Sequence, residues 1–286
     1  MSSAFDTLRI YLYRASGISL DAEKTYLADS RLQPLMQRLG IADLEALVSR
    51  LVAGFEPDLT REVIDAMTTN ETFFFRDRTP FDNFRKVVLP ALLEARKDIG
   101  RIRIWCAACS TGQEPYSLSM VLDEEAQRLT GWEIEIVATD LSHSVIANAR
   151  EGLYSQFEVQ RGLPIAQLLR YFRQEGDRWR INEVLRARVR FEQFNLLSDY
   201  AELGRFDVIF CRNVLIYFDV PTKRAVLEKM ARIMPADGYL FMGAAETVIG
   251  LTDAFVPHEE HRSINVPKRA ALTPARVPLR LVASQS

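Results

Sequence analysis

The chain has 286 residues, of which 48% are hydrophobic and 26% charged, and its formal net charge is -2. This composition is that of a globular protein with room for one large domain or two smaller ones. A net charge near zero excludes a global field that would draw the protein onto nucleic acid or an anionic membrane. The N-terminus has no secretion signal and no stretch reaches roughly 18 apolar residues, so we expect a cytoplasmic protein.

Three cysteines stand in apolar, strand-like segments, at Cys106, Cys109 and Cys211. An odd set of this kind suits a reducing compartment better than a disulfide framework. Cys106 and Cys109 form a C-x-x-C pattern, but no second Cys or His pair stands nearby to complete a zinc site, and the histidines form no H-E-x-x-H motif. We therefore predict buried cysteines and assign no metal.

The N-terminal part of the chain carries apolar residues at every third or fourth position, the spacing of amphipathic helices, and has no alternating strand pattern. One helix is expected over residues 21–39, ended by Gly40, and a further helix over residues 41–52. The pattern predicts an all-helical domain over residues 1–75, joined by a linker over residues 76–90 to whatever follows.

Lys24, Arg31 and Arg38 are spaced by seven residues, so they line up on the side of the first predicted helix that faces away from its leucines. A basic row of this kind is either a solvated helix face or a docking surface for an acidic partner helix. Both interpretations stay open.

Beyond residue 100, strand patterns alternate with helix patterns, which favours a parallel sheet flanked by helices over residues 91–266. The alternation breaks over residues 152–188, where the turn signal Gly176-Asp177 beside a short strand at 179–181 predicts an inserted helix and a small antiparallel flap. Residues 267–286 are rich in Pro, Ala and Arg and lack periodicity, so we predict a disordered tail. The strands are expected over 101–106, 133–139, 189–194, 206–211 and 238–243, and the helices over 114–128, 142–151 and 222–233.

In an open parallel sheet, a ligand lies beyond the carboxyl ends of the strands. The first of these ends, residues 107–117, is a run of small residues that admits a ligand close to the backbone but lacks the G-x-G-x-x-G of a phosphate cradle. A ligand without phosphates, such as S-adenosylmethionine, suits this loop, and Glu114 is placed to bind its amino group. At the second end, Asp140 is placed to accept both ribose hydroxyls, although an aspartate there is also a common helix N-cap.

The strand over residues 206–211 runs directly into Arg212 and Asn213, which are poor choices for a core and good choices for the floor of an active site. The segment over residues 68–77 joins the two predicted domains and contains three consecutive phenylalanines, which we interpret as packing side chains. Asn70, Thr72 and Arg76 in the same segment are less easily explained by packing.

Five motifs, in this order, resemble those of the CheR chemotaxis receptor methyltransferases. The resemblance covers residues 5–255, and five ordered motifs make chance similarity implausible. The motifs are TTNETFFFRD at 68–77, WCAACSTGQEPYS at 105–117, ATD at 138–140, FEQFNLL at 191–197 and FDVIFCRNVLIYF at 206–218.

The resemblance implies a small helical bundle followed by a Rossmann-like methyltransferase sheet with an inserted flap. It implies S-adenosylmethionine as the cofactor, S-adenosylhomocysteine as the product, and glutamates on the cytoplasmic helices of membrane chemoreceptors as the substrate. We expect a monomer that neither enters the membrane nor binds nucleic acid. The row of Lys24, Arg31 and Arg38 would then dock the receptor helices.

Carried over position by position, the resemblance places Arg76 and Tyr217 nearest the methyl transfer. It also implies a cofactor pocket made of Asn70, Thr72, Arg76, Glu114, Asp140, Asn195, Leu196, Arg212 and Asn213. A glutamate side chain with an ordinary pKa near 4.3 is ionised at neutral pH, so its attack on a sulfonium methyl group needs no general base. The scarcity of acid-base groups among these residues agrees with that chemistry.

The turn of the predicted flap, residues 173–179, is short. Some members of the family dock a pentapeptide from the receptor C-terminus on this flap, and those members share a longer, glycine-containing turn. The present chain looks more like the members that act without the pentapeptide.

Two alternatives stay open. The first is a methyltransferase of the same fold that acts on another protein or a small molecule. The second is a non-catalytic S-adenosylmethionine sensor whose helical domain is the output module. A dinucleotide oxidoreductase is disfavoured because the phosphate-binding glycines are missing.

Overall fold

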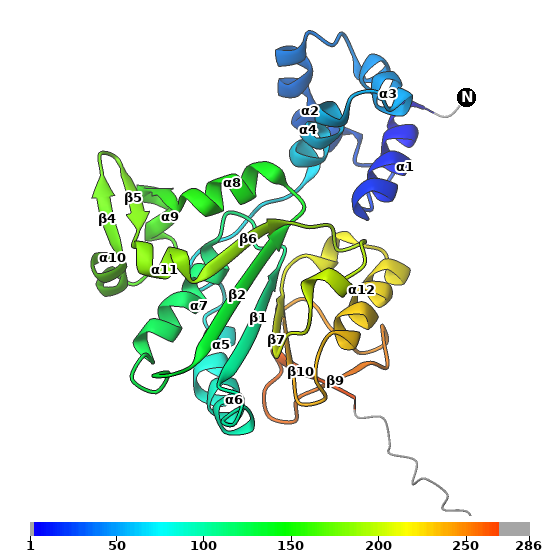
Figure 1. The fold of residues 1–286 in the computed structure, drawn as a ribbon. Helices are drawn as coiled ribbons and strands as arrows, with labels where there is room; N and C mark the ends of the chain where they lie inside the picture. Colours follow the sequence, from blue (N-terminus) through cyan, green and yellow to red (C-terminus); the bar gives the residue numbers. More distant parts are fainter. Residues whose placement is uncertain (1–2, 269–286) are drawn as a thin grey trace, which may run out of the picture.

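The computed structural model describes residues 3–268 of the protein. It consists of a helical N-terminal domain, a sheet domain and a small subdomain inserted into the latter, which we call the insert (Figure 1). The fold predicted from the sequence is thereby confirmed. Of the predicted tail over residues 267–286, only the first two residues belong to the described part, and residues 269–286 lie outside it.

The N-terminal domain is built from α1 (Ala4–Ser16), α2 (Thr25–Leu39), α3 (Leu44–Ala53) and α4 (Pro57–Met67). Its core is made of fully buried aliphatic side chains, among them Leu8, Leu12, Ala28, Leu32, Leu47 and Val63. The helix predicted over residues 21–39 begins at Thr25, because Lys24 donates its backbone N–H to the Asp21 carbonyl in a turn. The next helix begins only after Asp43, whose side chain accepts from the backbone N–H of Ala46 as an N-cap.

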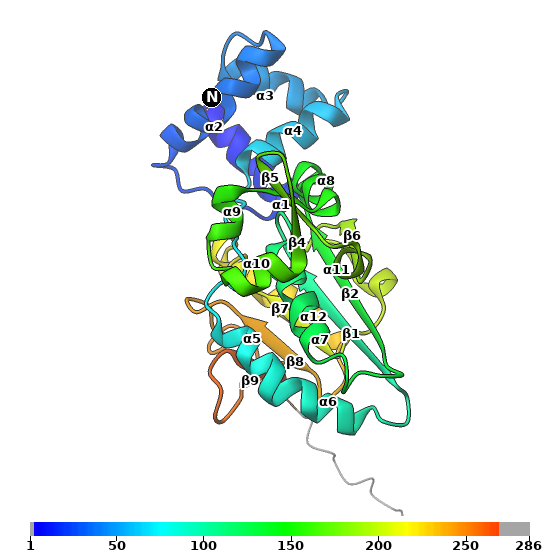
Figure 2. The same ribbon diagram turned by 90° about the vertical axis from the view of Figure 1, so that its left-hand side faces the viewer.

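Residues 79–95 are helical and belong to the sheet domain. They form α5 (Thr79–Asn83), the π-helical turn η1 (Phe84–Val88) and α6 (Leu89–Ala95), which run along one side of the sheet (Figure 2). The linker predicted over residues 76–90 is therefore much shorter. The physical reason is that Phe81, Phe84, Val88 and Leu89 bury their side chains in the same core cluster as the strands.

A seven-stranded sheet with the order β6-β2-β1-β7-β8-β10-β9 forms the centre of this domain. Its first five strands are parallel, and β10 runs antiparallel to both β8 and β9. The five parallel strands match the predicted ones within two residues at each end. The strands are β1 (Arg101–Ala107), β2 (Glu133–Asp140), β6 (Val189–Gln193), β7 (Val208–Cys211), β8 (Tyr239–Met242), β9 (Phe255–Pro257) and β10 (Ile264–Pro267).

The apolar side chains on the two faces of the parallel strands enter two different core clusters. On one face, Ile102 and Ile104 of β1 pack with α7 (Gln113–Glu124), α8 (His143–Glu151) and the helical segment over residues 79–95. On the other face, Trp105 packs with the aromatic residues of the loop after β6 and with α12 (Val220–Arg232). This period-two division makes the sheet the centre of a doubly wound domain.

The insert is a three-stranded antiparallel sheet with the order β3-β5-β4, together with short helices. The hairpin between β4 and β5 turns through Gly176 and Asp177 as predicted, and Gly176 has a φ of +63°. The elements are β3 (Leu153–Ser155), α9 (Gln156–Gln160), α10 (Ile165–Tyr171), β4 (Phe172–Glu175), β5 (Arg178–Ile181) and α11 (Glu183–Ala187).

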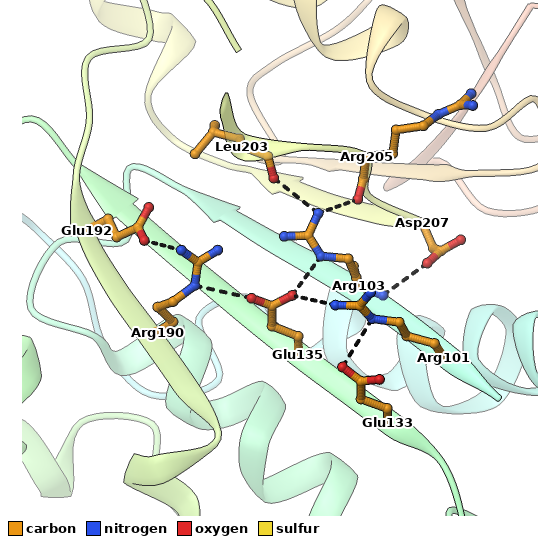
Figure 3. Close-up of polar contacts among 9 residues, drawn as sticks. All are labelled: Arg101, Arg103, Glu133, Glu135, Arg190, Glu192, Leu203, Arg205 and Asp207. Atoms are coloured by element: carbon orange, nitrogen blue, oxygen red, sulfur yellow. Dashed lines mark hydrogen bonds and ion pairs between the residues drawn. The ribbon is translucent and has the colours of Figure 1, made fainter. Parts of the chain in front are cut away.

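One part of the central sheet is covered by paired charged side chains instead of a helix. The connection from β6 to β7 contains only the 3-10 turn η2 (Ala201–Leu203), and no helix lies in front of β2 and the start of β1 in the view of Figure 1. Alternate outward positions there are charged, and Figure 3 shows them linked across β1, β2 and β6. Glu135 accepts from Arg103 at 2.7 Å and from Arg190 at 3.1 Å.

Glu135 is the centre of this network, since it also lies 3.5 Å from Arg101. Partial burial raises the pKa of Glu135, but the hydrogen bond and charge of Arg103, followed by those of Arg190, lower it more. The net pKa lies below the ordinary value of 4.5. Its contribution to stability is therefore present above the unfolded-state pKa and is lost as the pH falls through the folded-state pKa.

We predict that Glu135→Gln lowers the free energy of unfolding at pH 7 by on the order of 1 kcal/mol, because Arg103 and Arg190 lose their shared counter-charge. The difference from the unmodified protein should shrink as the pH falls through the folded-state pKa of Glu135. Urea titrations at several pH values measure both effects. Glu133→Gln is the matched control, since Glu133 is 67% exposed and, among residues 3–268, pairs only with Arg101. An equal loss in both variants would contradict the role given to Glu135.

Within residues 3–268, no helix has both the length and the apolar character needed to cross a membrane.

Candidate functional site

A cavity lies at the carboxyl ends of β1, β2 and β7, between the helical domain and the sheet domain. Its empty volume is about 990 Å³, open mouth included. The structure brings together in its lining every residue that the sequence predicted for the cofactor pocket and the methyl transfer. These are Asn70, Thr72, Arg76, Glu114, Asp140, Asn195, Leu196, Arg212, Asn213 and Tyr217.

Asp140 fastens the loop after β1 to the end of β2. Its carboxylate accepts from the backbone N–H of Ser110 at 2.8 Å and from that of Ser142 at 3.0 Å, one bond to each oxygen. Burial raises the pKa of this carboxyl group, and the two backbone hydrogen bonds oppose that rise. Because each carboxylate oxygen has a second lone pair, Asp140 can still accept hydrogen bonds from a ligand in the cavity.

Arg212 is the most deeply buried charge in the lining, with a side chain only 1% exposed. Its guanidinium group donates to Glu114 at 2.8 Å, to Asp77 at 2.7 Å and to the backbone carbonyl of Arg76 at 2.9 Å. Burial raises the pKa of Glu114, while the charge and hydrogen bond of Arg212 lower it. Arg212 therefore joins β7, α7 and the segment between the two domains, residues 68–78, which we call the interdomain segment, at one point of the cavity wall.

Glu246 is a site residue that the sequence interpretation missed. It lies in the loop after β8, and its carboxylate accepts from the backbone N–H groups of Gly243, Asn213, Val214 and Leu215 at 2.7 to 3.1 Å. It thereby holds the chain that leads from β7 to Tyr217. A carboxylate in a loop gives no pattern of its own, so only the proximity of the ends of β7 and β8 could have revealed it.

The interdomain segment is held mainly through its backbone. The hydroxyl of Ser110 donates to the Asn70 carbonyl at 2.8 Å, and the backbone N–H of Phe75 donates to the Ser117 hydroxyl at 3.0 Å. The predicted packing role of the phenylalanines holds for Phe74, which is fully buried in the core of the sheet domain. Phe73 has a different role, because its ring lies beneath the guanidinium groups of Arg76 and Arg161.

The end of α1 closes another side of the cavity. Asn195 donates its side-chain N–H to the Ala15 carbonyl at 2.8 Å and accepts from the backbone N–H of Leu197, so both ends of its amide hold the protein together. The backbone N–H of Ser19 donates to the Tyr217 carbonyl at 2.9 Å. The helical domain is thus a wall of the site.

Each residue of the predicted basic row has a partner within the N-terminal part of the chain. Lys24 precedes the helix and pairs with Asp21, and Arg38 pairs with Glu62 of α4. Arg31 donates to the backbone carbonyls of Met67 and Thr68 and to the Thr69 hydroxyl. The reason is that α4 packs beside α2 and ends there, and an arginine satisfies carbonyl groups that a helix end leaves without partners.

Backbone strain is concentrated around the cavity. Among residues 3–268, the non-glycine residues with positive φ all lie in the interdomain segment and the loops after β1 and β7. These conformations cost free energy and persist where the surrounding structure enforces them, typically at functional sites. The residues are Phe75, Asp77, Arg78, Ala108, Ser110 and Asn213.

The cysteines are free thiols, and all three are buried. Burial raises the pKa of each thiol well above its ordinary value, so they are inert packing residues at neutral pH. Among the described residues, no group of three or more His, Cys, Asp or Glu side chains could hold a metal ion.

The lining fits S-adenosylmethionine better than a dinucleotide. It contains two carboxylates suited to ribose hydroxyls and an ammonium group, Asp140 and Glu114. The Nε atom of Arg212 is buried and has no hydrogen-bond partner within residues 3–268, although such donors are nearly always satisfied. The loop after β1 has a single glycine, Gly112, so it lacks the glycines that let a pyrophosphate approach the backbone.

Comparison with known proteins agrees with this geometry. Residues 70–264 match the model of the CheR methyltransferase SAM-binding domain, and residues 3–68 match the CheR methyltransferase all-alpha domain. Chemotaxis protein methyltransferase Cher2 of Pseudomonas putida is 44% identical over 256 residues, which cover 88% of this chain and 92% of that protein. Chemotaxis protein methyltransferase 1 of Pseudomonas aeruginosa is 45% identical over 255 residues, with the same two coverages.

The fold and the cavity define an S-adenosylmethionine-dependent methyltransferase. Within that class, the chain belongs to the CheR methyltransferase family.

We predict that Glu246→Gln lowers the free energy of unfolding by about 1 to 3 kcal/mol, because the amide has one acceptor oxygen and turns an NH₂ group toward backbone donors. It should also weaken the binding of S-adenosylhomocysteine, since the loop that carries Asn213 is released. Urea titration and calorimetry measure the two effects. Glu259→Gln, in an exposed loop, serves as the control. Unchanged values for both quantities would show that the four hydrogen bonds do not hold the loop.

Proposed function

We propose that this protein transfers the methyl group of S-adenosylmethionine to glutamate carboxylates on the cytoplasmic helices of chemoreceptors, giving glutamate methyl esters. The observation that carries the proposal is the placement of Arg76 and Tyr217 in the wall of the cavity, with no histidine or lysine in its lining within residues 3–268. The names of the relatives, chemotaxis protein methyltransferases, support the receptor as the substrate. The protein then works in the cytoplasm, as a monomer.

This lining suits a substrate that needs no deprotonation. A glutamate carboxylate is already ionised at neutral pH, so the chain has only to hold it in line with the methyl group and exclude water. Alignment of this kind lowers barriers by up to roughly 7 to 11 kcal/mol. The guanidinium group of Arg76 and the hydroxyl of Tyr217 are the groups that we assign to the carboxylate.

The cofactor supplies an electrophilic methyl group. We assign Asp140 to its ribose hydroxyls and Glu114 to its amino group, with Asn70, Thr72, Arg76, Arg212 and Asn213 as further pocket residues. Asn195 and Leu196 contribute through position and packing, because the Asn195 amide is engaged with Ala15 and Leu197.

The experiment that tests the function is methylation of receptor fragments with labelled S-adenosylmethionine, followed by mapping of methyl esters by mass spectrometry. We expect esters on glutamate side chains of the cytoplasmic helices. Labelled methyl on another kind of side chain or on a small molecule would support a same-fold methyltransferase with a different substrate. Absence of any transfer would support the sensor alternative.

In the same assay, Tyr217→Phe should slow turnover by about ten- to a hundredfold, because it removes one hydrogen bond that orients the reacting group. The affinity for S-adenosylhomocysteine, measured by calorimetry, should change little. A large loss of affinity would instead show that Tyr217 builds the cofactor pocket. Tyr26→Phe, on α2 outside the lining and 68% exposed, is the matched control.

We propose further that receptors are recognised without a C-terminal pentapeptide. The β4–β5 hairpin, with only Gly176 and Asp177 between its strands, supports this proposal. Lys24 and Arg38 remain as candidates for receptor docking, since their partners Asp21 and Glu62 are themselves partly exposed. Arg31 is a weaker candidate, because it is bound to the end of α4.

We predict that receptor fragments with and without a C-terminal pentapeptide are methylated at equal rates, and that the free pentapeptide does not bind at low micromolar concentration. Lys24→Glu combined with Arg38→Glu should slow methylation at low receptor concentration without changing the affinity for S-adenosylhomocysteine. Binding of the pentapeptide in calorimetry would disprove recognition without a pentapeptide. An unchanged KM of the double variant for the receptor would disprove the docking role of Lys24 and Arg38.

A further inference from the structure

Arg161, the C-cap residue of α9, links the insert to the interdomain segment through two side-chain contacts. Its Nη2 atom lies 2.6 Å from a carboxylate oxygen of Glu71. Its guanidinium carbon lies 4.4 Å from the centre of the Phe73 ring, within the range of a cation–π contact. Arg161 itself does not line the cavity.

Arg76 is held by the same two residues. Its Nη1 atom donates to the Glu71 carbonyl at 2.7 Å, and its guanidinium carbon lies 5.7 Å from the centre of the Phe73 ring. Arg76 and Glu71 both line the cavity. Arg76 and Arg161 therefore share the Phe73 ring, and they contact Glu71 at different groups, Arg76 at its backbone carbonyl and Arg161 at its carboxylate.

The backbone on either side of Arg76 is fixed by other means. Arg212 binds the Arg76 carbonyl and Asp77, and the Phe75 N–H binds Ser117. Gly162, next to Arg161, approaches the Phe74 carbonyl so closely that a Cβ atom there would overlap it. The core thus places the Arg76 backbone, whereas the long side chain still has rotamer freedom that local contacts must remove.

We infer that Arg161 is a positioning residue, which orients the side chain of Arg76 in the cavity through Phe73 and Glu71 and so couples the insert to the site. Without Arg161, the Glu71 carboxylate and the Phe73 ring each lose a partner. Arg76 then samples more orientations, and its contribution to the site falls. This inference rests on the proposed function only through the role of Arg76.

The primary test is calorimetric binding of S-adenosylhomocysteine, which needs no receptor. Arg161→Met should weaken binding about fivefold, which corresponds to a typical coupling between groups in one network. Arg161→Lys, which keeps the ion pair but stacks less well, should recover part of the loss. Arg173→Met is the matched control, because Arg173 pairs with Glu175 inside the insert.

A double-mutant cycle separates positioning from a general effect on folding. In an Arg76→Lys background, Arg161→Met should change the affinity by about twofold or less, because the side chain that it orients has been replaced. An equal loss in both backgrounds, or no loss in the unmodified protein, would overturn the inference. Melting temperatures of all variants should agree, since Arg161 is 40% exposed.

Methylation of receptor fragments distinguishes a failure of this inference from a failure of the proposed function. If the unmodified protein methylates glutamates, Arg161→Met should lower kcat/KM for the receptor, and Arg173→Met should not. If the unmodified protein methylates no receptor, the proposed function fails, while the calorimetric cycle still decides the role of Arg161.

Discussion

The buried guanidinium group of Arg212 is the interaction on which the rest of the site depends. A charge with a 1% exposed side chain is stable only if it is paired and hydrogen-bonded, and here Glu114, Asp77 and the Arg76 carbonyl meet that requirement. Those three partners come from the first helix after β1 and from the interdomain segment. Satisfying one charge therefore fixes the two chain segments that carry Asn70, Thr72, Arg76 and Glu114 of the proposed pocket.

The strain around the cavity follows from the same constraint. Phe75, Asp77 and Arg78 adopt positive φ values on either side of the carbonyl that Arg212 binds. Asn213, directly after Arg212, does so as well, and Glu246 satisfies the N–H groups that this turn leaves without partners. The backbone conformation here is set by hydrogen bonds to Arg212 and Glu246, and not by a helix or a strand.

Prediction from the sequence succeeded where the signal was periodic or stood directly at a strand end. The five parallel strands have apolar or alternating patterns, Asp140 ends β2, and Arg212 and Asn213 follow β7 directly, so topology alone brings these three residues together. Asn70, Thr72 and Arg76 were predicted from the family resemblance of the motif at 68–77. The short strands β9 and β10 escaped prediction, because three or four residues at a sheet edge give no distinctive pattern.

Prediction failed where a side chain serves a neighbour that the sequence does not reveal. Arg31 has the spacing of a surface row, yet it satisfies the last carbonyls of α4. Residues 79–90 looked like a linker, although their aromatic and aliphatic side chains complete one face of the sheet. Glu246 and Arg161 make contacts between segments far apart in the chain, and neither belongs to a recognisable motif.

The cavity has walls from both domains, and this has a thermodynamic consequence. Any molecule that fills it contacts the end of α1 and the α4 junction as well as the strand ends, so it binds the associated arrangement of the domains in preference to a separated one. Ligand concentration and domain association are then linked quantities. A ligand that binds only the associated state, present at a hundred times its dissociation constant, would stabilise that state by about 2.7 kcal/mol.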